Sequence, residues 1–196
     1  LKITCQGSVN SFRLPEFHTY HKTLPLPPKT TIGGLIGSAL GLSPQQVNSD
    51  WLLPMRFQVG ICGTVGGKAG DLWQIRKYDQ KQIAAFQKGE ELYPFKTAVI
   101  VRELLFRTAF SIYLTFTEKK DFDLTEAAFR NPAWALSLGR EDELIKILRI
   151  EQADLSEGEG LVFKNTVLPG DLNTDGYNLD RNDLSGFVGK NLLNDA

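Results

Sequence analysis

Four residues in one short stretch have side chains that could act on RNA: His18, Tyr20, His21 and Lys22. Metal-free RNA cleavage needs a base to take the 2′-hydroxyl proton, an acid for the leaving oxygen and a cation for the charge that develops on the phosphate. This set could supply all three. The same residue types also bind single-stranded RNA without cleaving it, because bases stack on rings and phosphates pair with cations. The stretch therefore leaves an endoribonuclease and an RNA-binding protein both open.

The stretch belongs to a connection, residues 7–23, which follows a short predicted strand over residues 1–5. A connection of this length without secondary structure is uncommon in a compact domain unless it has a function. Arg13 adds a further cation, and Phe12 and Phe17 add rings. This mixture predicts an RNA-binding surface rather than an ordinary surface loop.

A proline-rich segment leads from this connection into a helix with few side chains on one side. The apolar spacing predicts a helix through Ile32 and Leu40, with Thr30 or Thr31 as its N-cap. Its four glycines each cost about 1 kcal/mol relative to alanine in a helix interior, so another backbone should approach closely on that side. The alternative is that the glycines only pack the helix on a sheet. The RNA contacts predicted here are Lys29, Thr30, Thr31, Gly33 and Gly34.

Two segments alternate between apolar and polar residues and predict half-buried strands. In residues 55–61 the inward set begins with Met55 and Phe57, and residues 110–116 alternate in the same way. Residues 144–150 are apolar enough for a final strand. With the first strand, these segments make four strands.

Helical spacing returns in residues 124–136, where the residues expected to face a core are Leu124, Ala127, Ala128, Trp134 and Leu136. Pro132 should break or kink this helix. The order of elements is then βαββαβ, the ferredoxin-like pattern that RNA-recognition modules also have. The sequence therefore predicts an α+β protein of the ferredoxin-like, RRM-like class.

The segment between the two middle strands, residues 64–107, is longer than a minimal domain of this class needs. It has 8 basic and 5 acidic residues, with Trp73 and Tyr78 beside cations around a glycine-rich turn. These charges favour a phosphate backbone as partner, and a solvated β-arm is the alternative. The RNA contacts predicted in this segment are Arg76, Lys77, Arg102 and Arg107.

The composition limits the other classes of function. The chain has 196 residues, 42% of them hydrophobic, which is enough for one substantial core, and no apolar run approaches the length of a membrane span. It has two cysteines, two histidines and no C-x-x-C pair, which argues against a disulfide framework or a structural zinc site. We expect no metal, no cofactor and a cytoplasmic location.

The net charge of −1 hides a division between two parts of the chain. Residues 1–107 have 13 basic and 7 acidic residues, whereas the remainder has 9 and 16. This asymmetry predicts one face for a polyanion and another for basic protein neighbours, unless the acidic residues only solvate the tail. Because the composition turns to Gly, Asp and Asn near residue 152, we predict a main domain over residues 1–152 and a small, turn-rich C-terminal extension over 153–196.

Several of these features together resemble a known family. They are a Ser-Phe-Arg turn after the first strand, a tyrosine before Thr-x-Pro, a Pro-Pro pair, Thr-Ile-x-Gly before a glycine-rich helix, and the stretch LSLGREDEL around Gly139 and Arg140. On these residues the chain resembles the CRISPR-associated RAMP proteins, specifically Cas family 5. That subunit holds the 5′ end of the guide RNA in type I Cascade complexes.

The resemblance implies a non-catalytic subunit that caps the 5′ handle of crRNA. Its partners would be that handle, the backbone (filament) subunit, the large subunit and, through the complex, target DNA. The segment 64–107 would be the β-hairpin thumb that reaches over guide RNA and the neighbouring backbone subunit. In this reading of the family, Arg13, Lys22 and Lys29 would clamp the sugar-phosphate chain, Tyr20 and His21 would stack on splayed bases, and Arg140 would be a further contact.

One branch of the family processes its own guide RNA with a Tyr, Lys and His set in which the Lys and His are adjacent and lie further along the chain. No Lys-His pair occurs here, because the order is His21-Lys22 and it falls in the first connection. We therefore expect no enzymatic activity. The first alternative is a metal-free endoribonuclease that processes CRISPR repeat RNA, and the second is a ferredoxin-like protein-interaction domain without nucleic acid.

Overall fold

The computed structural model describes residues 1–17, 19–52, 55–91, 93 and 96–154. His18 and nearly all of the predicted C-terminal extension lie outside the described residues. Within them, no helix is long and apolar enough to cross a membrane.

The strands form one sheet in the order that the sequence pattern predicted. β1 (Lys2–Asn10) pairs antiparallel with β4 (Lys96–Phe116) on one side and with β5 (Ile145–Glu151) on the other, and β3 (Phe57–Lys77) pairs antiparallel with the far edge of β4. The order β5-β1-β4-β3 is that of a ferredoxin-like βαββαβ sheet. The short β2 (Tyr20–His21) adds a parallel pair to β4. The predicted fold class is confirmed.

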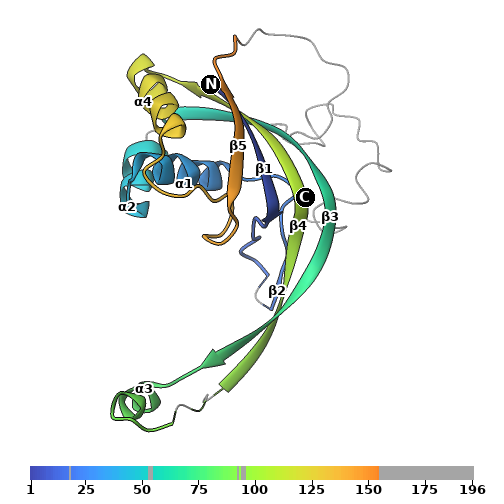
Figure 1. Ribbon diagram of the computed structural model, residues 1–196, viewed down its shortest axis with the longest axis vertical. Helices are drawn as coiled ribbons and strands as arrows, with labels where there is room; N and C mark the ends of the chain where they lie inside the picture. The colour runs from blue at the N-terminus through green and yellow to red at the C-terminus, as the bar shows by residue number, and fades with distance from the viewer. Residues whose placement is uncertain (18, 53–54, 92, 94–95, 155–196) are drawn as a thin grey trace.

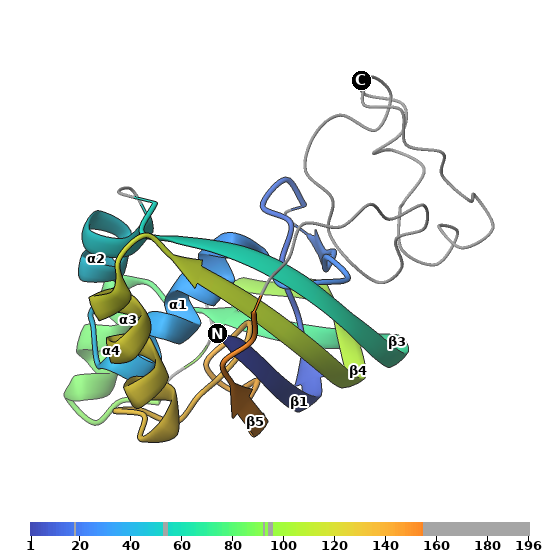
Figure 2. The same cartoon turned by 90° about the horizontal axis from the view of Figure 1, so that it is seen from above.

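Three helices cover one face of this sheet. α1 (Lys29–Leu40), α2 (Pro44–Val47) and α4 (Lys119–Arg130) lie together on that face, and a short π-helix, η1 (Asn48–Leu52), follows α2 (Figures 1 and 2). Fully buried side chains of α1 and of the sheet make the core between these layers. Burial of each large apolar side chain contributes about 1.5–3 kcal/mol, so this layer holds the fold together. The largest of these side chains are Phe57, Phe110, Ile3, Ile32, Ile36 and Ile112.

The glycine-rich helix begins earlier than the sequence predicted. Its N-cap is Pro28, with φ −71°, and no side chain caps it, so the prediction of Thr30 or Thr31 as N-cap is wrong. Proline suits the start of a helix because its ring fixes φ. It also has no backbone N–H that would be left without a partner there. The Thr31 amide donates to the Pro28 carbonyl at 2.9 Å, so it is not a free donor. At the start of α2, by contrast, Ser43 is the N-cap and forms a capping box with Gln46.

The longest elements are β3 and β4, which continue together beyond the sheet as an arm. Their register runs without a shift from Phe57 opposite Phe116 to Lys77 opposite Lys96, and α3 (Gln80–Gln87) lies between them at the tip (Figure 1). Residues 64–107, predicted as an insertion, are thus the outer parts of two strands of the sheet, with an added helix that the sequence pattern had not indicated. The arm and the sheet are one continuous ladder.

Arg107 has an unusual backbone conformation near the base of the arm. The β3–β4 ladder passes from Val65 opposite Thr108 to Gly67 opposite Phe106, and between these pairs Arg107 has a φ of 50°. A left-handed conformation is strained for a residue with a Cβ. Gly66 makes it possible for the strands to stay close, since a Cβ there would lie 3.0 Å from the Arg107 Cβ.

Two predicted segments differ in their ends and in the face that they bury. Met55 is 66% exposed and has a φ of 52°, so the strand begins at Phe57 and Met55 does not face inward. The last helix starts at Lys119 and ends before Pro132, which moves its buried face to Thr125 and Phe129. The first strand also runs further than predicted, to Asn10, which shortens the connection after it.

That shift also corrects three predicted core residues. Leu124 is 51% exposed and Trp134 is 66% exposed, and Ala127 also lies on the exposed side of α4. Helical spacing alone does not say where a helix begins, and the charged first turn from residue 119 had no apolar signal.

Candidate nucleic-acid interface

The short strand β2 brings His21 beside the base of the arm. His21 lies opposite Arg102 in the β2–β4 pairing, and Tyr20 lies opposite Val101. Neighbouring residues of a strand point to opposite faces. His21 therefore shares a face of the arm with Arg102, whereas Tyr20 lies on the other face.

Arg102 is held between an acid and a ring on the first face. Its Nη2 donates to Asp71 Oδ2 at 2.7 Å, and its Cζ lies 3.8 Å from the centre of the Trp73 ring. Asp71 is directly opposite Arg102 in the register and Trp73 is two residues further along β3, an arrangement in which side chains of one face meet. Arg102 is only 7% exposed, whereas Trp73 keeps 41%. The charge of Arg102 is thus compensated within the protein.

The loop of residues 136–144 adds Arg140 to the same face. Its Nη2 donates to His21 Nδ1 at 3.2 Å, and its Cζ lies 5.5 Å from the centre of the Trp73 ring. Because a guanidinium only donates, His21 Nδ1 accepts and has no proton in this arrangement. We call the set of His21, Asp71, Trp73, Arg102 and Arg140 the arm-base cluster.

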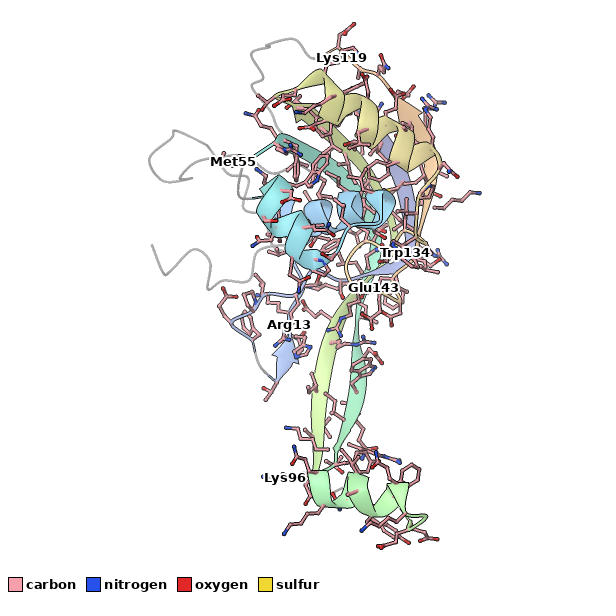
Figure 3. The ribbon with its side chains drawn as sticks, turned by 90° about the vertical axis from the view of Figure 1, so that its left-hand side faces the viewer. Arg13, Met55, Lys96, Lys119, Trp134 and Glu143 are labelled. Atoms are coloured by element: carbon pink, nitrogen blue, oxygen red, sulfur yellow. The ribbon has the colours of Figure 1, made fainter. Side chains whose placement is uncertain are left out.

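A buried carboxylate holds this loop against the end of β1. Glu143 is 4% exposed, and its Oε2 accepts from the Ser11 amide at 2.7 Å and the Arg140 amide at 2.9 Å. Ser11 Oγ donates to the other carboxylate oxygen, and Asn10 Nδ2 donates to the Leu138 carbonyl at 2.6 Å. Figure 3 shows Glu143 at the level where the arm leaves the body. Hydrogen bonds to a carboxylate are strong, so Arg140 extends from a fixed loop.

The opposite face of the arm base is organised around Glu103. Its carboxylate accepts from Tyr20 Oη at 2.9 Å and from the Thr23 amide at 3.0 Å, and Lys68 Nζ lies 2.8 Å away. Burial raises the pKa of the Glu103 carboxyl, but the hydrogen bonds from Lys68, Thr23 and Tyr20 outweigh burial and hold that pKa below its ordinary value. Burial, and then the bond to the Glu103 carboxylate, raise the pKa of Tyr20. The cation on this face is therefore also paired.

The glycine side of α1 is largely occupied by the protein's own side chains. A Cβ at Gly33 would lie 2.8 Å from Leu52 Cδ2, and a Cβ at Gly37 would lie 2.1 Å from Val47 Cγ2. At Gly34, by contrast, a Cβ would have nothing within 4 Å. Two of the glycines thus allow close packing, as the alternative proposed, but against α2 and η1 rather than a sheet.

Gly34 lies in an open groove of about 400 Å³ beside α1 and α2. Lys29 does not line this groove, and its Nζ lies 5.1 Å from the centre of the Phe57 ring. Since none of the lining residues is charged, the groove has no cation to offer a phosphate. The residues that line it are Thr30, Gly34, Ser38, Leu42, Pro44, Val47, Leu52 and Trp134.

Arg13 and Lys22 lie together on the connection before α1. Arg13 Nη2 donates to the Phe17 carbonyl at 3.3 Å, and Lys22 Nζ lies 5.6 Å from the centre of the Phe17 ring. The Lys29 side chain, by contrast, lies over the Phe57 ring of β3.

The remaining predicted contacts are spread along the arm. Arg76 and Lys77 lie near its far end, where Lys77 is opposite Lys96, and all three are exposed (Figure 3). Arg107 lies near the base of the arm. The arm also exposes large apolar side chains, which mark contact surfaces when they gather. These are Leu72, Ile83, Phe86, Tyr93 and Val99.

No metal site is found among the residues that the structure describes, and the Cys5 thiol is not reactive. No three His, Cys, Asp or Glu residues there gather in a way that could hold a metal ion. Cys5 is buried in the core, and burial raises the pKa of its thiol to about 12, so it stays protonated at neutral pH.

Sequence analysis missed the acids that organise the site. Asp71, Glu103 and Glu143 each hold a predicted residue in place, but an acid in a basic segment looks like a solubilising charge. One signal was present in the stretch that contains Glu143. Gly139 has a φ of 117°, and a Cβ there would lie 2.1 Å from Glu143 Oε2, so the glycine marks a tight turn around that carboxylate.

Comparison with known proteins decides the family. The family model described as "CRISPR-associated protein (Cas_Cas5)" matches residues 1–184. The chain belongs to this family. The resemblance to Cas family 5 that the sequence motifs indicated is therefore confirmed. A comparison with curated protein sequences gives no match.

A solved structure shares the fold of this Cas5 family member. A chain of a structure described as "CRISPR RNA-guided surveillance complex" is 21% identical with a TM-score of 0.57, over 79% of this chain and 65% of that chain. A chain described as "Crystal structure of Cas protein" is 21% identical with a TM-score of 0.45, over 74% of this chain and 58% of that chain. The Cas5 chain thus spans less than two thirds of the length of either structure.

Proposed function

We propose that this protein is a non-catalytic RNA-binding subunit of a type I CRISPR effector complex, and that it holds the 5′ handle of crRNA in the cytoplasm. The observation that carries the proposal is the arm-base cluster. There, three segments remote in the sequence bring two guanidinium groups and a part-exposed indole onto one face of the arm. Cations for phosphates and a ring for bases are what single-stranded RNA requires. Membership of the Cas5 family supports RNA as the ligand.

The arm supports a second part of the proposal, a contact with the neighbouring backbone subunit. Its apolar side chains are well exposed, with Leu72 at 70%, Val99 at 56% and Phe86 at 55%. Exposed apolar residues together with the basic residues Arg76 and Lys77 suit a surface that meets protein and RNA at once. The large subunit and, through the complex, target DNA are the other partners in this proposal.

Absence of catalysis is part of the proposal, and the positions of Tyr20 and His21 support it. A general base and a general acid must both reach one phosphodiester. Tyr20 and His21 lie on opposite faces of the arm, Tyr20 is bonded to Glu103, and His21 is bonded to Arg140. Incubation of the complex with CRISPR repeat RNA in EDTA should leave the RNA intact. Specific cleavage of the repeat under these conditions would establish the endoribonuclease instead.

The decisive experiment is recovery of RNA with the assembled complex. When the chain is expressed with its neighbouring subunits and a CRISPR array, the purified assembly should contain RNA of one guide length with a common repeat-derived 5′ end. Sequencing from that end checks this outcome. An assembly with the absorbance of pure protein would refute the proposal and favour a protein-interaction domain without nucleic acid.

A further inference from the structure

The arm-base cluster contains one cation that no carboxylate compensates. We propose that Arg140 and Trp73 together bind a single ribonucleotide of the RNA, Arg140 through the phosphate and Trp73 by stacking on the base. The proposal rests on the proposed function and assigns the contacts within it. The proposal assigns the phosphate contact to Arg140 and not to Arg102 or Lys68, although all three are basic residues.

The ion pairs at the arm base single out Arg140. Arg102 pairs with Asp71 at 2.7 Å and Lys68 pairs with Glu103 at 2.8 Å, so each of these cations has its own anion. Arg140 forms no ion pair within the part of the chain that the structure describes. Its side chain contacts a neutral acceptor, His21 Nδ1, and the Trp73 ring.

This difference has a direct consequence for phosphate binding. A guanidinium has five N–H donors, and the hydrogen bond to His21 uses one of them. The others can form the paired hydrogen bonds that a phosphate accepts. A phosphate on Arg102 or Lys68 would have to share the cation with a carboxylate that repels it. No described carboxylate pairs with the Arg140 guanidinium, so a phosphate there meets less repulsion.

The Trp73 ring is arranged to receive a base next to that phosphate. The Arg102 guanidinium lies 3.8 Å from the ring centre, which is stacking contact, and leaves the indole 41% exposed. At 5.5 Å the Arg140 guanidinium is beyond such contact and does not cover the ring in the same way. A base on the open part of the indole completes a stack of guanidinium, indole and base. Because every base has a π-face, this site selects single-stranded RNA rather than a sequence.

The test measures binding of a fluorescently labelled, single-stranded 5′-handle RNA to the complex reconstituted without crRNA, over a series of salt concentrations. Each phosphate neutralised on a single strand contributes about 0.7 to the slope of log affinity against log salt. Arg140→Ala should weaken binding and lower the slope by about 0.7. Arg149→Ala is the matched control, because Arg149 is an exposed arginine on β5 that already pairs with Glu151 at 3.3 Å. It should leave both quantities unchanged.

Tryptophan fluorescence tests the stacking half of the proposal separately. RNA should quench the tryptophan emission of the complex with the wild-type chain more than that of the complex with Trp73→Phe, because the variant lacks the emission of Trp73. Trp51 is 3% exposed, so it is a poor alternative quenching site. Suppose that the wild type binds RNA tightly, that Arg140→Ala keeps the full salt slope, and that RNA quenches the fluorescence of Trp73→Phe as much as that of the wild type. The nucleotide site is then wrong, and the proposed function stands. If the wild type binds no handle RNA, the proposed function itself fails.

Discussion

The glycine side of α1 and the base of the arm were both predicted to hold RNA, and the structure makes them very different surfaces. The helix side is an uncharged groove, with Gly33 and Gly37 packed against Leu52 and Val47. The arm base is rich in charge, and most of that charge is paired within the protein. The two regions therefore differ in the contacts that they could offer to RNA.

The difference teaches that glycines in a helix indicate close packing, whereas basic residues indicate a polyanion partner only under a further condition. Glycines in a helix require something close by, and in this protein α2 and η1 meet most of that requirement. Basic residues attract a polyanion only to the extent that local acids leave them unpaired. Within the arm-base cluster that condition singles out Arg140, whereas none of the described residues that line the groove is charged.

The largest expected effect tests the packing of the helix side. Gly37→Ala should lower the free energy of unfolding by about 3 kcal/mol, because the new Cβ would lie 2.1 Å from Val47 Cγ2 and over-packs that site. Gly34→Ala is the matched control, since nothing lies within 4 Å of its Cβ. It should stabilise the helix by up to about 1 kcal/mol. Denaturant unfolding of both variants measures this difference. Equal effects would show that Val47 does not pack against Gly37 in this way.

The next effect compares the two exposed tryptophans. Trp73→Ala should weaken binding of single-stranded RNA by about 1–3 kcal/mol, the usual value of one stacked base. Trp134→Ala, which removes the ring beside the uncharged groove, should leave RNA affinity unchanged. RNA titrations of the two variants in the complex measure this difference. A loss with Trp134→Ala as large as that with Trp73→Ala would mean that the groove also holds RNA.

A smaller effect concerns the pH dependence of the arm base. Because the pKa of Glu103 in the folded protein lies below its ordinary value, its carboxylate stabilises the fold at neutral pH. That contribution is lost as the pH falls through the folded-state pKa. The stability gap between the wild type and Glu103→Gln should therefore be present at pH 7 and narrow in acid. Unfolding curves at a series of pH values test this, and a gap that stays constant down to pH 3 would contradict it.

The smallest effect concerns Lys29, the first residue of α1. Lys29→Met keeps an aliphatic stem over the Phe57 ring and removes only the charge. We expect a loss of stability below about 1 kcal/mol, the value of an exposed cation–π contact. The salt dependence of RNA binding should not change. A drop in the salt slope like that expected for Arg140→Ala would join the two regions into one RNA path after all.

Much of the fold could be predicted because its signals are local. The alternation of residues 110–116 and the Ser43 capping box report on residues a few positions apart, and the structure has both. The ends of elements were harder. The last helix was displaced because its first turn is charged, and Met55 was placed inward because its left-handed backbone leaves no trace in an alternating pattern.

The residues of the candidate site were partly predicted as types but not as an arrangement. Arg102, His21 and Arg140 were named, and the structure brings them together around Trp73. Their acids were not named, and neither was the separation of Tyr20 from His21 by the two faces of a strand. Register decides both of these features, and register depends on pairing between distant segments.

The amino-acid sequence by itself determined the order of strands and helices, the class of the sheet and the Cas5 family, because these depend on short-range patterns and on motifs. Only the tertiary structure decided which cation of the arm-base cluster pairs with a described acid and which does not. Arg102 meets an acid 31 residues away, and Arg140 meets a neutral histidine 119 residues away. The physical reason is that an ion pair depends on distance in space, which strand register and a loop held by Glu143 determine here.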